Sequence, residues 1–469
     1  MPLSDLKSKY SRKELLYRNN ADDNRIMNKY YPSKHDSHGN LLYALLCCVY
    51  DGADNLEDIK KKMRILFISA SKQVIIDDVD VEEKFQIAKH KNLIIADDDV
   101  HITLTQEGKK LVEASYIENL HTSNWMGILF SAKTVLVTSA MVLIVLSLLK
   151  ILMGLELASQ GMLTEGLENL TDFIKIGLVG IIGLKYKKDR LASFLIIIMM
   201  MVTGVTMIWS GIDALLNPST IIPTIQAFLI CVLSITLNLG MAFLKGMVGR
   251  ASGNLAFLSD SKDSSFNVKI SIGVLIGLIF AIFGYYFMDA IVGILIAVLV
   301  FKEGIEILLE LRKKEEDFDI TNIKVVADNI YESRITAYIL GSIRRENLTR
   351  NELLNNFERG LGLARVYFEG FADFFHDQLD AYIVEKHLNT LITGKYIEEK
   401  ENKDLSLTSK GLKAFYKAKI REYRERADQI KIKIRFKWSS LTFFIIVGFI
   451  ILLFVFAGEI NAFLSSLTI

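Results

Sequence analysis

The hydrophobic positions of the chain form long runs in its middle and one further run near its C-terminal end. Each run approaches or exceeds the ~20 residues that a helix needs to cross the core of a bilayer. With only four prolines in the chain, the runs suit long, uninterrupted helices. The pattern therefore predicts six membrane spans and a separate seventh, at residues 127–151, 161–185, 191–214, 221–246, 262–287, 288–311 and 441–457.

Shorter apolar patterns before and after the six runs predict globular segments of mixed helix and strand. The first segment reads as three helices, a two-stranded hairpin and a further helix that opens at Thr105-Gln-Glu-Gly108. The second segment repeats this order, and Thr408-Ser-Lys-Gly411 corresponds to the same helix start. In both segments the order of elements resembles that of a winged helix.

The expected fold class is therefore mainly α: a polytopic membrane helical bundle with two winged-helix-like α+β domains attached. We expect an N-terminal arm, a first winged-helix-like domain, a six-span membrane domain, a second winged-helix-like domain, a linking helix and a seventh transmembrane helix. These parts occupy residues 1–35, 36–120, 125–314, 318–412, 413–437 and 438–459, respectively.

Composition and charge agree with a membrane protein and give it an orientation. The 469 residues are 51% hydrophobic and 23% charged, too apolar for a soluble enzyme and too charged for a bare membrane bundle. Lysine and arginine gather in the loops at 185–190 and 245–250 and after the sixth span at 312–314. By the positive-inside rule we expect a multi-pass protein of the plasma membrane, with a cytoplasmic N-terminus and an extracytoplasmic C-terminus.

Nucleic acid is a disfavoured partner of the winged-helix-like domains. The formal net charge is only +1, and the first predicted wing carries three consecutive aspartates at 97–99. Phosphate groups would be repelled by such a wing. Protein contact, such as dimerisation, is the favoured role.

Two predicted spans carry paired oxygen-bearing side chains. Glu168 and Asp172 lie four residues apart, and Asp263 and Asn267 repeat this spacing. On a helix the spacing places both members of a pair on one face. Ionisable groups inside a span are costly and point to a functional site by default. Two such helices can supply four ligands to one cation.

The residues around these pairs resemble the cation diffusion facilitator family. Lys150, Gly154, Ser159 and the acidic residues after them follow the pattern of the family's first hairpin, and Asn254–Leu278 is similar to its fifth span. The resemblance covers about 127–312. It implies a homodimeric transporter, not an enzyme, that moves a divalent metal out of the cytoplasm in exchange for protons. The ligands carried over by position are Glu168, Asp172, Asp263 and Asn267.

The chain departs from the family pattern in its ligands and beyond them. Glu168 and Asp263 stand where zinc-type members have histidine, and Asn267 stands where aspartate is usual. The His-Pro-Tyr-Gly stretch and the ferredoxin-like cytoplasmic domain of the family are not recognisable. An all-oxygen site suits Mn²⁺ first and Fe²⁺ next, ahead of Zn²⁺, which prefers nitrogen and sulfur. A self-repelling carboxylate cluster would also couple transport to protons.

Two lysines leave alternative interpretations open. Lys175 and Lys269 follow the paired residues closely, and either can form a structural salt bridge that replaces the metal. Glu165 and Asp260 lie near predicted span ends, where each is either solvated or, like the lysines, a second-shell or proton-coupling residue. The alternative functions are a membrane-tethered regulator or sensor built on a degenerate transporter core, and a structural scaffold.

Overall fold

The computed structural model forms two compact units. The flanking unit comprises Met1–Ile128 and Ile330–Trp438, and the membrane unit comprises Leu129–Asn329 and Ser439–Ile469. The structure describes residues 3–7, 14–15, 21–31, 41–68, 73–97, 101–156, 160–217, 223–285, isolated positions between 287 and 309, 323–326, 328–369 and 380–424.

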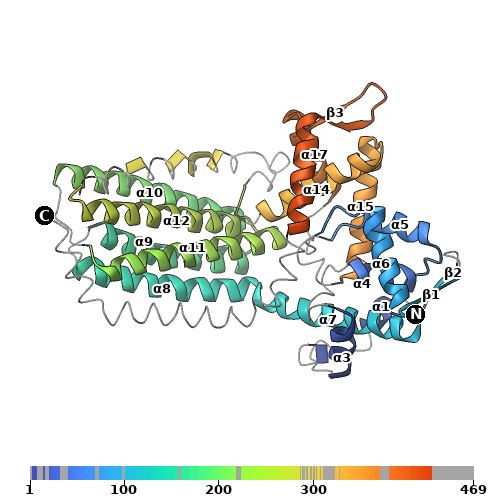
Figure 1. Ribbon diagram of the computed structural model, residues 1–469. Coiled ribbons are helices and arrows are strands. Elements are labelled where there is room, and N and C mark those ends of the chain that lie inside the picture. The colour runs from blue at the N-terminus through green and yellow to red at the C-terminus, as the bar shows by residue number, and fades with distance from the viewer. Residues whose placement is uncertain are drawn as a thin grey trace. The chain divides into compact units, whose positions relative to one another are not determined.

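The membrane unit is a bundle of long helices that run alongside one another (Figure 1). In chain order they are α8 (Ala132–Glu156), α9 (Gln160–Leu178) with its π-helical continuation η1 (Val179–Lys185), α10 (Asp189–Leu216), α11 (Ile225–Ser252) and α12 (Leu255–Ile282). The hairpin partners α8 and α9 pack together, as do α11 and α12, and α12 also contacts α9 and α10.

Four helices of the described residues, α8, α10, α11 and α12, are long and apolar enough to cross a membrane. Met141, Leu152 and Leu155 of α8 and Trp209 of α10 are exposed to 64% or more. An apolar outer surface of this kind is what lipid contact requires. The chain is therefore a multi-pass membrane protein.

The remaining predicted spans differ in how far the structure describes them. The second span is seen as α9 and η1. Four ionisable side chains of α9 set it apart from the more apolar helices. More than half of the sixth predicted span, 288–311, lies outside the described residues, as do the seventh span at 441–457 and residues 425–437 of the linking helix. The described part of that linking helix runs over 409–424.

The fifth span begins earlier than the hydrophobic pattern predicts. The side-chain oxygen of Asn254 accepts hydrogen bonds from the backbone N–H groups of Ala256 and Phe257, which caps α12 at Leu255 instead of 262. The polar start of α12 is therefore part of the helix, and Asp260 lies inside the bundle rather than at a solvated end.

The flanking unit contains the element order expected twice. Its first half holds α4 (Leu41–Tyr50), α5 (Leu56–Ile65), α6 (Asp78–His90), β1 (Ile94–Asp97), β2 (His101–Leu104) and α7 (Gln106–Leu129). Its second half holds α14 (Asp328–Arg345), α15 (Arg350–Tyr367), α17 (Ala381–Thr393), β3 (Ile397–Glu399), β4 (Leu405–Leu407) and the helix at 409–424. Both hairpins are antiparallel, with Ile94 opposite Leu104 and Ile397 opposite Leu407.

The two helix starts matched in the sequence have the same local structure. The Thr105 hydroxyl accepts a hydrogen bond from the Gly108 N–H at 3.0 Å, and Thr408 accepts one from Gly411 at 3.1 Å. A Cβ atom on either glycine would lie 2.0 Å from a carbonyl oxygen of the preceding hairpin. This shared turn supports the internal repeat, while the winged-helix identity of the halves stays a prediction.

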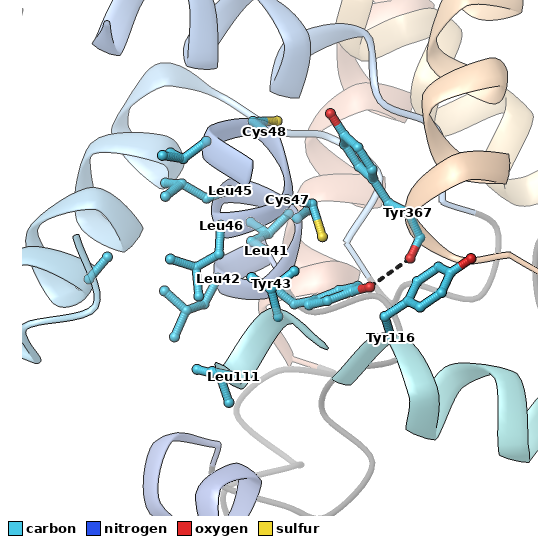
Figure 2. Packing of buried hydrophobic residues seen from close by; sticks show 14 of the residues in the cluster. Leu41, Leu42, Tyr43, Leu45, Leu46, Cys47, Cys48, Leu111, Tyr116 and Tyr367 are labelled. Atoms are coloured by element: carbon cyan, nitrogen blue, oxygen red, sulfur yellow. Dashed lines mark hydrogen bonds between the residues drawn. The ribbon is translucent and has the colours of Figure 1, made fainter. Parts of the chain in front are cut away.

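The two halves share contacts instead of forming independent domains. The Tyr43 hydroxyl donates to the Tyr367 backbone oxygen at 2.8 Å, inside a core that also holds Cys47, Leu111 and Tyr116 (Figure 2). Helix α4 of the first half and the end of α15 of the second half thus pack into one hydrophobic core.

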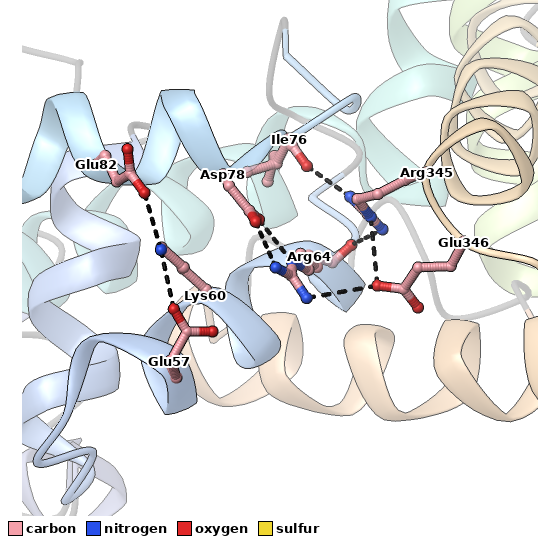
Figure 3. A network of polar contacts seen from close by, with 8 residues as sticks. All are labelled: Glu57, Lys60, Arg64, Ile76, Asp78, Glu82, Arg345 and Glu346. Carbon is pink, nitrogen blue, oxygen red and sulfur yellow. Dashed lines mark hydrogen bonds and ion pairs between the residues drawn. The ribbon is translucent and has the colours of Figure 1, made fainter.

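A polar network links the halves a second time (Figure 3). Arg345, at the end of α14, donates to the backbone oxygens of Ile76 at 2.6 Å and Arg64 at 3.0 Å. Arg64 in turn pairs with Asp78, and the hydrogen bond from its guanidinium holds the pKa of that carboxyl below its ordinary value. These contacts join α14 to the segment that connects α5 and α6.

The predicted N-terminal arm is partly folded onto the same core. Helices α1 (Leu3–Lys7) and α3 (Ala21–Tyr30) occupy its described residues, and Leu3, Met27 and Tyr30 are buried. The apolar side chains of these two helices lie in the hydrophobic core that Tyr43 and Tyr367 share.

We expect Gly360→Ala to loosen the contact between the halves. A Cβ at Gly360 of α15 would lie 1.7 Å from the Ile65 carbonyl oxygen, whereas nothing lies within 4 Å of a Cβ at Gly362. Gly360→Ala should destabilise the unit by about 1–3 kcal/mol, while Gly362→Ala should leave it unchanged or stabilise it by up to about 1 kcal/mol. Amide hydrogen exchange of α5 and α15 in the full chain measures both, and equal exchange in the two variants would contradict this packing.

Candidate functional site

One face of α9 carries a buried polar stripe. Glu165, Glu168, Asp172 and Lys175 follow one another at intervals of three, four and three residues, which keeps them on one side of the helix. All four are buried, and Lys175 has no exposed surface. The amphipathic pattern of α9 is thus turned inward, with its polar face inside the bundle.

A matching stripe runs along α12. Asp260, Asp263, Asn267 and Ser271 are spaced by three, four and four residues and are also buried. Because α9 and α12 contact each other, the two stripes meet inside the membrane unit. The arrangement brings together oxygen-bearing side chains that lie about 90 residues apart in the sequence.

Lys175 joins the two stripes at their centre. Its Nζ lies 2.7 Å from Asp172 Oδ1 and 2.8 Å from Asp263 Oδ2. The Asn267 side-chain amide donates a hydrogen bond to the other oxygen of Asp172. Three of the four ligands predicted from the sequence therefore belong to one connected cluster, with a lysine ammonium between the two aspartates.

The fourth predicted ligand, Glu168, is buried beside this cluster. It is only 8% exposed and interacts electrostatically with Asp172, Lys175 and Asp263. Its Oε2 atom has no hydrogen-bond partner among the residues that the structure describes. A buried carboxylate oxygen without a partner is costly and suggests that a cation or proton completes its surroundings.

Two further lysine–acid pairs flank the centre. Lys150 of α8 pairs with Glu165 at 2.5 Å, and Ser271 donates a hydrogen bond to the same carboxylate. Lys245 of α11 lies 2.9 Å from Asp260 and donates to Ser264 at 2.9 Å.

These pairs correct the sequence analysis in two respects. Glu165 and Asp260 are not solvated at span ends, because each is buried against a lysine from a neighbouring helix. Lys150 and Lys245 were not singled out as site residues. A lysine within a predicted hydrophobic run was the signal that could have found them.

Lys269 lies apart from the central cluster. It is exposed, and its Nζ is 4.7 Å from the centroid of the Phe266 ring. Because Lys269 follows Asn267 by only two residues, helical geometry points it to a different side of α12. A second-shell or proton-coupling role for Lys269 stays a prediction.

The described residues contain no group of three or more His, Cys, Asp or Glu side chains arranged to hold a metal ion. At the centre of the cluster, the Lys175 ammonium forms ion pairs with both Asp172 and Asp263. Among the described residues of the membrane unit, five buried carboxylates face three buried lysines, a formal excess of two negative charges. One divalent cation would balance that excess.

Comparison with known proteins assigns the membrane unit to a family. Residues 136–313 match the model of the cation efflux transmembrane domain. The chain is also 27% identical over 180 residues to an uncharacterized transporter, MJ0449, of Methanocaldococcus jannaschii. Its membrane unit is therefore that of a cation diffusion facilitator family protein. The match points to a transporter and not to an enzyme.

The name of a second relative specifies the metal that this relative transports. The chain is 24% identical over 202 residues to the manganese efflux system protein MneS of Bacillus subtilis. The matched regions are 35% and 40% of this chain, and 63% and 69% of the two relatives. The chain thus covers slightly less than two thirds of the Methanocaldococcus protein.

We expect Lys150→Met to destabilise the membrane unit strongly. Removing one partner of a buried ion pair leaves the Glu165 carboxylate uncompensated, at a cost of about 3–5 kcal/mol. Adding Glu165→Gln should recover part of this loss, because both charges are then gone. The stability of the wild type, of Lys150→Met and of the double variant can be compared by unfolding each protein in mixed detergent micelles and following its helical circular dichroism signal.

Lys133→Met is the matched control, since Lys133 lies on the same helix but is exposed. It should change the stability little. A loss as large as that of Lys150→Met would show that the Lys150–Glu165 pair is not the cause.

Proposed function

We propose that this family member exports a divalent metal cation from the cytoplasm in exchange for protons. The metal ligands in this proposal are Glu168, Asp172, Asp263 and Asn267. The observation that carries the proposal is the meeting of two buried polar stripes, from α9 and α12, around the unpartnered Glu168 oxygen.

Mn²⁺ is the favoured substrate, followed by Fe²⁺ and then Zn²⁺. All four proposed ligands offer oxygen, which suits hard cations. The described residues of the two stripes contain neither histidine nor cysteine, the ligands that Zn²⁺ prefers. The similarity to a manganese efflux protein of Bacillus subtilis supports the same order.

Exchange with protons follows from the charge of the site. The excess of two negative charges in the bundle can be balanced by one divalent cation or by two protons. A site that binds either one divalent cation or two protons in alternation would carry metal out of the cytoplasm and protons into it. The carboxylates of Glu168, Asp172 and Asp263 would serve as both ligands and proton acceptors, with Glu165 and Asp260 as further proton-coupling candidates.

The positive-inside pattern supports an N-terminus in the cytoplasm and a C-terminus outside. A homodimer is part of the proposal, as the family resemblance implies. For the flanking unit we favour a role in protein contact over nucleic-acid binding, since the acidic residues 97–99 oppose phosphate.

A regulator or sensor on a degenerate core is the second candidate. The specific observation in its favour is the double ion pair of Lys175, which fills the position that a shared metal would take. If Lys175 stays paired with Asp172 and Asp263 permanently, the membrane unit cannot bind a metal between them. The regulatory function would then reside in the flanking unit.

Metal uptake by reconstituted vesicles separates the two candidates. With an acidic lumen, we expect wild-type protein to drive Mn²⁺ uptake faster than Fe²⁺ or Zn²⁺ uptake. Collapse of the pH gradient should slow it. Asp172→Asn should reduce uptake to the level of empty vesicles, because it removes a charged ligand at the centre of the cluster.

Asp213→Asn is the control, since Asp213 is an exposed residue near the end of α10, and it should transport like the wild type. Absence of flux for all three metals in wild-type vesicles would refute the transporter proposal and favour the regulator.

A further inference from the structure

Lys175 occupies the position that a cation shared by α9 and α12 would take. It is fully buried, and its ammonium lies within 2.8 Å of an oxygen from each of Asp172 and Asp263. These are two of the four proposed metal ligands. A divalent cation and this ammonium therefore compete for the same pair of carboxylates.

We propose that Lys175 is a tethered competitor of the transported cation: metal binds as the ammonium leaves Asp172 and Asp263, and the ammonium returns as the metal is released. This inference rests on the proposed function. It assigns Lys175 a positioning role that sets metal affinity and release.

The surroundings of Lys175 favour exchange over a permanent pair. Its ammonium leaves Glu168 Oε2 unpartnered, although that oxygen is more than nine-tenths buried. With Lys175 in place, a formal excess of two negative charges remains in the bundle, and one divalent ion would balance it. The flexible four-carbon stem of lysine permits the ammonium to withdraw without any change in the backbone.

The other two buried lysines differ from Lys175 in what they touch. Lys150 pairs with Glu165, and Lys245 pairs with Asp260, neither of which is a proposed ligand. Lys175, by contrast, forms ion pairs with two of the proposed ligands, Asp172 and Asp263. The competing role is therefore specific to this position and not a general property of lysines in the bundle.

A tethered competitor predicts opposite effects on binding and turnover. Lys175→Met and Lys175→Gln remove the competing charge, so calorimetric titration with MnCl₂ should show at least about tenfold tighter binding. In vesicles the KM for Mn²⁺ should fall, and the maximal rate should fall as well, because nothing displaces the metal. A merely structural lysine would give weaker binding and no fall in KM.

Two variants bracket the effect of charge. Lys175→Arg keeps a cation between the aspartates and should bind Mn²⁺ no more tightly than the wild type. Lys133→Met removes an exposed lysine of α8 and should leave both affinity and rate unchanged. If Lys175→Met and Lys175→Gln fold poorly, Mn²⁺ present during purification should restore them by supplying the missing charge, and failure of Mn²⁺ to do so would overturn the inference.

The remaining outcomes separate this inference from the proposed function. Wild-type flux with unchanged or weaker Mn²⁺ binding in Lys175→Met and Lys175→Gln would overturn the competitor and leave the transporter standing. Absence of binding and flux in every form would refute the transporter itself. If Lys175→Met alone binds Mn²⁺, and the wild type shows neither Mn²⁺ binding nor flux, then the ammonium does not exchange with the metal. Lys175 would in that case block the site permanently.

Discussion

The structure of the membrane unit depends on the pairing of charges inside it. An unpaired ionisable group in a bilayer costs several kcal/mol, so a lysine beside a buried acid of α9 or α12 lowers the cost of burying that acid. Lysines from α8, α9 and α11 meet Glu165, Asp172, Asp263 and Asp260. Helix register across the bundle is therefore constrained by electrostatics as well as by apolar packing.

In the proposed transporter, the same pairing would let one site be both stable and able to bind a substrate cation. Lys175 carries one positive charge on a flexible side chain, whereas the carboxylates around it together carry more than one negative charge. The unpartnered oxygen of Glu168 marks where compensation is incomplete. Glu165 and Asp260 each have a lysine as ion-pair partner, whereas Asp172 and Asp263 share Lys175 at the centre.

The flanking unit shows how a repeat can lose its independence. Each half keeps its own hairpin and its own threonine–glycine turn, because those are held by contacts a few residues apart. The cores nevertheless merge, with Tyr43 bonded to Tyr367 and Gly360 packed against the Ile65 carbonyl. Two sequence-distant domains become one unit because their apolar surfaces cover each other.

Local information in the sequence determined the four apolar helices, the helix and hairpin order of both flanking halves, and the spacing that aligns Glu168 with Asp172 and Asp263 with Asn267. Periodicity suffices for these, since each depends on neighbours within a turn or two. Only the tertiary structure decided that Lys175 reaches Asp263 across 88 residues of sequence. It also decided that Lys150 and Lys245 pair with Glu165 and Asp260, and that Lys269 is exposed near the Phe266 ring. Such partners are selected by how helices pack and in which register, and no local pattern carries that information.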